Sequence, residues 1–141
     1  MGSEDCIFCK IVRKEAPAHV VCEDERTLVF MDIFPVADGH TLIIPKAHCD
    51  DLFGADPDDL RAVVDRSRDV AHAISRALAP DGLGVYQLNG AAAGQTVFHY
   101  HMHLIPRSYG AGLQVHSRTP GDPKRLAQIA ARISAALVEA G

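Results

Sequence analysis

The chain has 141 residues, 48% hydrophobic and 23% charged, and a formal net charge of −4. This length predicts one domain, residues 1–141, with a hydrophobic core of its own. The negative charge argues against a protein that binds nucleic acid, and neither a membrane span of roughly 20 apolar residues nor a secretory signal is visible, so we expect a cytoplasmic protein.

The first half of the chain predicts one short helix and three strands. The helix is expected over residues 6–13 and ends before Pro17. Two strands follow over 18–23 and 27–32, joined by a polar turn, because β-branched and apolar residues dominate both stretches. After a loop over 35–39, an apolar strand over 40–45 is halted by Pro45.

The second half predicts a long helix, two more strands and a terminal helix. Asp56 and Pro57 form a helix start, apolar residues then recur at helical spacing, and Pro80 ends the pattern. Strands are expected over 84–89 and 98–106, and a helix over 121–140. The order predicts an α+β fold: an antiparallel sheet of about five strands with a long central helix and a C-terminal helix, the helices lying on one side.

Residues 99–105, with the sequence HYHMHLI, carry the strongest chemical signal. In a strand, successive side chains point to opposite faces, so the three histidines share one face. Neighbours on that face lie about 6.6 Å apart, and the outer two about 13 Å apart. A metal ion needs its nitrogen ligands at about 2.1 Å, so the row favours divided roles over one three-histidine metal site.

Cys6 and Cys9 have the two-residue spacing of metal knuckles and of redox motifs. A thioredoxin-like motif would follow a strand, whereas this pair opens the chain, so zinc is the favoured interpretation. Two further ligands must then come from elsewhere in the chain. Cys22 and Cys49 are expected to pack as small apolar residues.

Hydrogen-bond donors gather just before the histidine row. Gly94 would let backbone N–H groups approach an anion, and Gln95 and Thr96 add side-chain donors. Asn89, at the end of the preceding predicted strand, adds an amide. Together these residues indicate a phosphate site. His19, His72 and His116 lack such companions and are expected to be surface or packing residues.

With these motifs the chain resembles the histidine triad (HIT) family. The stretch 99–105 matches the family signature His-φ-His-φ-His-φ-φ, where φ is apolar, and the resemblance spans roughly residues 5–107. It is closest to the branch of small nucleoside-phosphoramidate hydrolases and their bacterial relatives. The further matching segments are Gly94-Gln95-Thr96, Asp32-Ile33 with His40, residues 42–46 and residues 8–11.

The resemblance implies a two-step reaction at the α-phosphorus of a nucleotide. His101 would attack and form a covalent nucleotidyl-histidine, which water hydrolyses. His103 would orient the site and contact phosphate, His40 would help to hold His101, and Thr96 would assist departure of the leaving group.

The resemblance also implies a nucleotide pocket. Phosphate charge would be stabilised by donors at Asn89, Gly94 and Gln95, beside His101 and His103. Asp32 would accept hydrogen bonds from the ribose hydroxyls. The base would lie between apolar side chains, namely Ile7, Phe8, Ile11 and Ile33.

Relatives with the same cysteine pair imply a ligand set for zinc: Cys6, Cys9, His48 and His99. Two thiolates and two imidazoles make a closed, structural site, so one zinc per chain and no organic cofactor are expected. The resemblance further implies a homodimer that binds a purine nucleotide such as an AMP derivative, and neither nucleic acid nor a membrane.

Two alternatives stay open at this point. A dinucleoside polyphosphate hydrolase would use the same first step, and Phe98 before the first histidine is only weak evidence against it. A non-catalytic nucleotide-binding or sensing protein would keep the pocket without turnover, although the intact triad and Thr96 argue against it. A uridylyltransferase of the family would have glutamine where His103 stands. The leaving group and the role of residues 108–141 are not determined.

Overall fold

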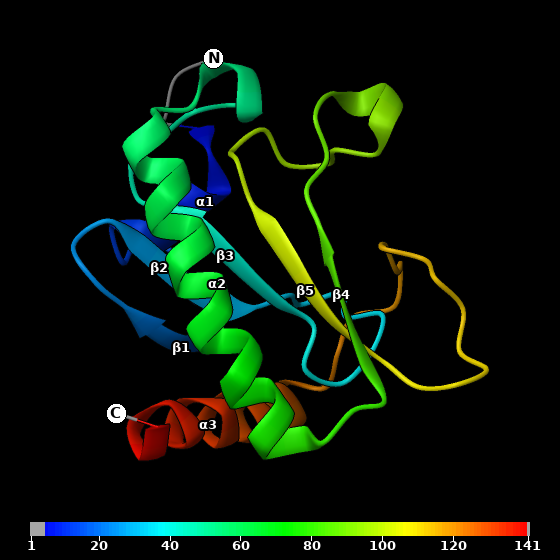
Figure 1. The fold of residues 1–141 in the computed structure, drawn as a ribbon. Coiled ribbons are helices and arrows are strands. Elements are labelled where there is room, and N and C mark those ends of the chain that lie inside the picture. Colours follow the sequence, from blue (N-terminus) through cyan, green and yellow to red (C-terminus); the bar gives the residue numbers. More distant parts are fainter. Residues whose placement is uncertain (1–4, 141) are drawn as a thin grey trace.

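The computed structural model describes residues 5–140 (Figure 1). The predicted domain limits 1–141 and the predicted lack of a secretory signal therefore fall partly outside the described residues. Five strands form one sheet in the order β1-β2-β3-β5-β4, and every neighbouring pair is antiparallel. The strands are β1 (Val20–Glu23), β2 (Thr27–Met31), β3 (Thr41–Pro45), β4 (Gly82–Tyr86) and β5 (Met102–Arg107).

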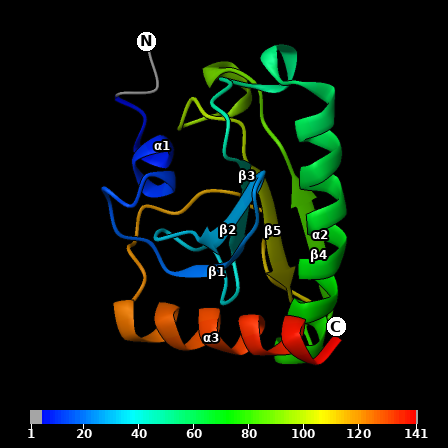
Figure 2. The same ribbon diagram turned by 90° about the vertical axis from the view of Figure 1, so that its left-hand side faces the viewer.

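The helices lie on both faces of this sheet. The long helix α2 (Pro57–Leu78) and the short helix α1 (Ile7–Val12) are on opposite sides, and α3 (Pro123–Ala140) crosses one end (Figure 2). The expected α+β class is confirmed, and α2 and α3 pack against the same apolar cluster as expected, whereas the short helix α1 lies on the other face. The reason is that α1 is amphipathic and buries Phe8, Cys9 and Ile11 against the second face.

Two apolar clusters hold these layers together. One lies between the sheet, α2 and α3, and includes Tyr100, Met102 and Leu104. The other lies under α1 and joins Phe8 and Ile11 to apolar residues of β2 and β3, among them Leu28, Phe30, Leu42 and Ile44. The residues that alternate with the histidines thus belong to the first cluster, which leaves the histidines on the α1 face.

Local signals explain the limits of α2. The Asp56 side chain accepts a hydrogen bond from the Asp58 backbone N–H, and Pro57 occupies the first turn. The helix ends at Leu78, where Ala79 takes a left-handed conformation (φ 47°) before Pro80. The predicted limits of this helix are confirmed.

Two strand predictions are wrong in their limits. β5 begins at Met102 instead of residue 98, because the Tyr100 N–H bonds the Cys49 carbonyl and residues 97–99 bend. β4 covers Gly82–Tyr86 instead of 84–89, since its ladder pairs Gly82 with Arg107 and stops at Tyr86 opposite His103. Short 3-10 turns form at Leu52–Gly54, before α2, and at Ala91–Ala93, between β4 and β5.

Over residues 5–140, none of the helices combines the length and apolar character needed to span a membrane.

Candidate functional site

Four histidines are buried on the α1 face of the sheet. His40 stands directly before β3, His103 lies in β5, and His99 and His101 lie in the segment just before β5. Their residues are 6% exposed or less. The ring centroids of His101 and His103 lie 4.9 Å apart, and those of His40 and His103 lie 5.2 Å apart. The three imidazoles therefore form one contiguous group.

The proton positions on His101 follow from its hydrogen bond. Its Nδ1 lies 2.7 Å from the carbonyl oxygen of His99. A carbonyl only accepts, so Nδ1 carries the proton and Nε2 keeps its lone pair. The Phe8 ring meets the imidazole edge-on at 5.2 Å and fixes its plane. The arrangement gives a neutral imidazole with one free nucleophilic nitrogen.

A second chain of hydrogen bonds sets the proton positions on His40 and His103. The backbone N–H of Val36 donates to His40 Nδ1 at 3.1 Å, so the His40 proton lies on Nε2. This Nε2 donates to His103 Nδ1 at 2.9 Å, with Asp32 Oδ2 also 3.4 Å away. The His103 proton is therefore on Nε2, a buried atom with no partner among the described residues.

Burial keeps these imidazoles neutral. It lowers the pKa of His40 to about 4 and the pKa of His103 to about 3. It also lowers the pKa of His101, against the bond to the His99 carbonyl, which raises it. Near pH 7 the site thus presents the lone pair of His101 Nε2 and the N–H of His103. A buried donor without a partner suits a ligand with acceptor oxygens.

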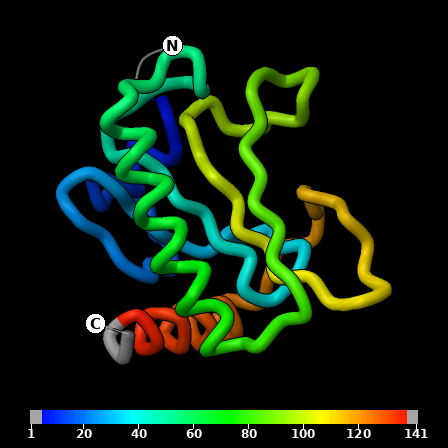
Figure 3. Tube along the Cα trace, in the orientation of Figure 1, coloured from blue at the N-terminus to red at the C-terminus, as the bar shows by residue number. Residues whose placement is uncertain are grey.

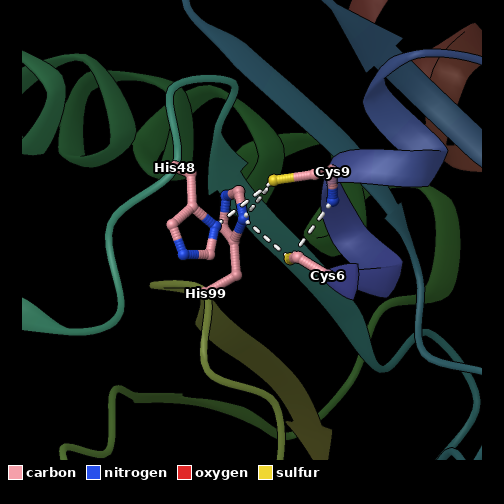
Figure 4. A group of neighbouring side chains, drawn as sticks. All are labelled: Cys6, Cys9, His48 and His99. Carbon is pink, nitrogen blue, oxygen red and sulfur yellow. Dashed lines mark hydrogen bonds between the residues drawn. The ribbon is translucent and has the colours of Figure 1, made fainter. Parts of the chain in front are cut away.

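A separate cluster brings together Cys6, Cys9, His48 and His99 (Figure 4). Cys6 caps the start of α1, Cys9 lies within it, and both thiols face the Nδ1 atoms of the histidines. Cys6 Sγ lies 3.3 Å from His99 Nδ1, and Cys9 Sγ lies 3.3 Å and 3.5 Å from Nδ1 of His48 and His99.

The cluster fits a tetrahedral metal ion. Bond lengths of about 2.3 Å to sulfur and 2.1 Å to nitrogen place neighbouring ligand atoms about 3.5 Å apart, close to the observed separations. The opposite ring nitrogens are already oriented: His99 Nε2 donates to the Pro45 carbonyl at 2.8 Å, and His48 Nε2 donates to Asp50 at 3.0 Å. Each Nδ1 is left as the ligand atom.

The same cluster is linked to His101 by one residue, His99. The His99 ring faces the thiols, while its backbone carbonyl orients His101. Burial raises the pKa of the Cys9 thiol to about 11, so a metal ion that binds here must displace a proton.

The predicted phosphate donors divide into two groups. The Gln95 side chain is buried and fully used, because its Oε1 accepts from the Gly90 N–H at 2.7 Å and its Nε2 donates to the carbonyls of Asp50 and Val97. The Asn89 amide bonds the Leu52 N–H and Gln87. Both side chains thus brace the loop, whereas Thr96 is exposed at its end.

The predicted base-binding residues also differ in exposure. Phe8 and Ile11 are 7% and 8% exposed and belong to the cluster under α1. Ile7 and Ile33 are 46% and 53% exposed, so they offer apolar surface to a ligand. Asp32, next to Ile33 in the chain, lies beside the triad: its Oδ2 is 3.4 Å from His40 Nε2, and its Oδ1 accepts from the Phe34 N–H at 2.8 Å.

Two residues of this region, Asp50 and His116, have contacts that the sequence did not predict. Asp50 orients His48, and its only sequence signal is a carboxylate two residues after a candidate ligand. His116, expected to serve only surface or packing, places its ring 5.9 Å from that of His103. No local sequence pattern predicts this contact, because it depends on the path that the chain takes between β5 and α3.

The sequence matches the HIT domain family over residues 13–110. A curated relative, adenylylsulfatase HINT3 of Arabidopsis thaliana, is 42% identical over 103 residues, which cover 73% of this chain and 52% of that protein.

Solved structures of similar proteins share the whole fold. A zinc-bound histidine triad family protein from Mycobacterium smegmatis has a TM-score of 0.86 at 38% identity, and the match covers 99% of this chain and 97% of that one. A hypothetical histidine triad nucleotide-binding protein from Sulfolobus tokodaii has a TM-score of 0.87 at 31% identity, covering 95% and 93%.

Proposed function

Because the chain belongs to the HIT domain family, we propose that it is a nucleotide hydrolase. Its substrates would be purine nucleoside phosphoramidates or adenylates, cleaved at the α-phosphorus. This proposal rests on two adjacent imidazoles that present different groups. His101 Nε2 has a free lone pair, and His103 Nε2 carries an N–H without a partner among the described residues. The name of the Arabidopsis relative, an adenylylsulfatase, supports an adenylyl group as the common part of the substrate.

In the first step, His101 Nε2 donates its lone pair to phosphorus, and the bond from phosphorus to the leaving group breaks. The Thr96 hydroxyl would hydrogen-bond to the leaving atom, which takes its proton from solvent. The His103 N–H would donate to a phosphate oxygen and stabilise the charge that develops there. In the second step, water attacks the same phosphorus and gives up a proton to solvent, while the P–N bond to His101 breaks and its electron pair returns to Nε2, so that the nucleoside monophosphate is released.

The remaining residues would bind the nucleotide. Asp32 would accept hydrogen bonds from the ribose hydroxyls through the lone pairs that remain on its two oxygens, since Oδ1 accepts from the Phe34 N–H and Oδ2 lies 3.4 Å from His40 Nε2. Ile7 and Ile33 would cover the base, with Phe8 and Ile11 beneath them. The loop from Asn89 to Thr96, braced by Gln95, would offer backbone N–H groups and the Thr96 hydroxyl to phosphate.

Zinc is the metal we propose for the Cys6, Cys9, His48 and His99 cluster. A set of two thiolates and two imidazoles in tetrahedral arrangement suits this ion, and a closed set of four ligands makes the site structural. The zinc-bound Mycobacterium smegmatis structure supports this choice. A homodimer is also proposed, with Val85 on the edge strand β4 and Phe98 as exposed apolar contacts.

The test compares wild-type protein with His101→Ala on adenosine phosphoramidate, adenylyl sulfate and diadenosine polyphosphates. Removal of the nucleophile is expected to lower kcat by at least about a thousandfold on every substrate the wild type cleaves. His72→Ala, an exposed position on α2, is the control and keeps full activity.

Circular dichroism and a thermal melt of both variants show that they are folded. Full turnover by a folded His101→Ala variant would contradict the mechanism. AMP binding without hydrolysis of any of these substrates would favour the sensing alternative.

A further inference from the structure

The segment of residues 108–122, here called the strap, connects β5 to α3 without helix or strand. It loops outward after β5 and returns toward α3 (Figure 3, yellow to orange). Arg107 holds its first part by donating to the carbonyls of Gly112 and Gln114, at 3.1 and 2.6 Å. The Gly121 N–H donates to the Ile33 carbonyl at 2.8 Å and holds its last part. The strap is therefore fixed at both ends beside the site.

His116 lies between these two anchors and contacts the site from outside. Its Nε2 lies 2.6 Å from the carbonyl oxygen of Gly94, so Nε2 carries the proton and donates. Its ring meets that of His103 edge-on, with centroids 5.9 Å apart and planes at 81°. The residue itself is exposed, so its burial contributes little to folding.

Gly94 is the residue at which the loop before the triad changes direction. It has a φ of 102°, a conformation that favours glycine, and it ends the 3-10 turn Ala91–Ala93. From the inner side, Gln95 ties this loop to the Asp50 and Val97 carbonyls. The Gly94 carbonyl itself is bonded by the His116 imidazole, and the Leu88 side chain lies close to the same glycine.

We propose that His116 is a positioning residue that fastens the strap to the loop of residues 90–96 beside His103. Its hydrogen bond would keep Thr96 and the loop N–H groups directed at the same phosphate as His103 Nε2. This inference rests on the proposed function for its effect on catalysis, but its effect on the loop is independent of any substrate.

The test uses three variants at this position. His116→Gln keeps a side-chain N–H that can reach the Gly94 carbonyl, His116→Ala removes it, and His116→Phe keeps a ring without the donor. His72→Ala, also an exposed histidine, is the matched control. With adenosine phosphoramidate, the Ala and Phe variants should lose about 10- to 100-fold in kcat, because small misplacements of reacting groups have effects of that order.

The change should fall on kcat more than on KM, since the ribose and base contacts are elsewhere. His116→Gln should recover most of the wild-type kcat. An unchanged kcat in His116→Ala would overturn the proposal, as would a His116→Gln variant as slow as the Ala variant.

Amide hydrogen exchange separates this proposal from the proposed function. The amides of residues 90–96 should exchange faster in the Ala and Phe variants than in wild type or His72→Ala, and at the wild-type rate in His116→Gln. If the wild type cleaves none of the nucleotides, the proposed function fails, whereas the exchange pattern still tests whether the His116 hydrogen bond fastens the strap to the loop. Equal exchange at residues 90–96 in all variants would overturn the proposed role of His116.

Discussion

The imidazoles of His40, His101 and His103 differ in which nitrogen carries the proton, and backbone groups set two of these choices. A carbonyl faces His101 Nδ1, whereas an N–H faces His40 Nδ1. These opposite partners place opposite tautomers on His101 and His40, the two rings that flank His103. The nucleophile and the donor of the proposed reaction therefore follow from main-chain geometry that substitution of nearby side chains leaves in place.

This assignment predicts a distinct nitrogen NMR signature. At pH 7, His101 should show a protonated Nδ1 and a bare Nε2, while His40 and His103 should show the reverse. Two-dimensional ¹⁵N–¹H correlation spectra of the ring nitrogens measure this directly, with exposed His72 as a reference for averaged tautomers. A protonated Nε2 on His101 in the free protein would remove the nucleophile from the proposed mechanism.

Much of this site could be predicted from the sequence, because its strongest signals are residue types at short, fixed spacings. The alternation around His101 and the two-residue spacing of Cys6 and Cys9 are readable from a few neighbouring letters. The roles of Gln95 and His116 are different. Their partners are carbonyls of Asp50, Val97 and Gly94, and a carbonyl is present at every residue, so sequence does not single out the one that is near.

The ends of a helix could be predicted from the sequence where a side chain caps the helix. α2 begins where Asp56 and Pro57 predict, because both act within one turn. The start of β5 was not predictable in this way. It depends on the Tyr100 N–H pairing with the Cys49 carbonyl, a contact between residues far apart in sequence.

The cap of α2 supports a stability prediction. Asp56→Ala removes the acceptor for the Asp58 N–H and should lower the free energy of unfolding by about 1 kcal/mol. Urea denaturation measures the change. Asp58→Ala is the control, since this exposed side chain pairs with exposed Arg61 in the first turn and its loss should cost less than about 0.5 kcal/mol. Equal losses in the two variants would contradict the assigned cap.

The cluster of Cys6, Cys9, His48 and His99 joins α1 to the chain just after β3 and just before β5. A metal ion bound there should therefore stabilise the packing of α1. Wild-type protein purified without chelator should contain about one zinc per chain, and Cys9→Ser should contain much less. The thermal midpoint of Cys9→Ser should also fall, because α1 loses its tie to His48 and His99. Elemental analysis and calorimetry measure the two effects.

Cys22→Ser is the matched control for this experiment. Cys22 lies in β1 beside the other apolar cluster, so its substitution should leave the zinc content unchanged. A wild-type protein without zinc, or a Cys9→Ser variant with full zinc content, would contradict the ligand assignment.

For the whole molecule, the buried histidines make stability depend on pH. Their pKa is ordinarily 6.5, whereas burial lowers it to about 4 for His40 and about 3 for His103. Between pH 6.5 and 4 the unfolded chain therefore binds protons that the folded chain does not. The free energy of unfolding must then fall as the pH falls through this range, and the full stability is present above pH 6.5.

The expected loss is on the order of a few kcal/mol, since each unit of pKa shift corresponds to about 1.4 kcal/mol. Urea denaturation from pH 7.5 to 4, with chelator present to remove any metal contribution, measures it. Asp24, whose pKa is lowered from 3.8 mainly by hydrogen bonds that outweigh its burial, adds its own loss only at lower pH. The His103→Gln variant should show a shallower slope than wild type, while His72→Ala should match it. A wild-type stability that stays constant from pH 6.5 to 4.5 would show that these imidazoles are not held neutral by the fold.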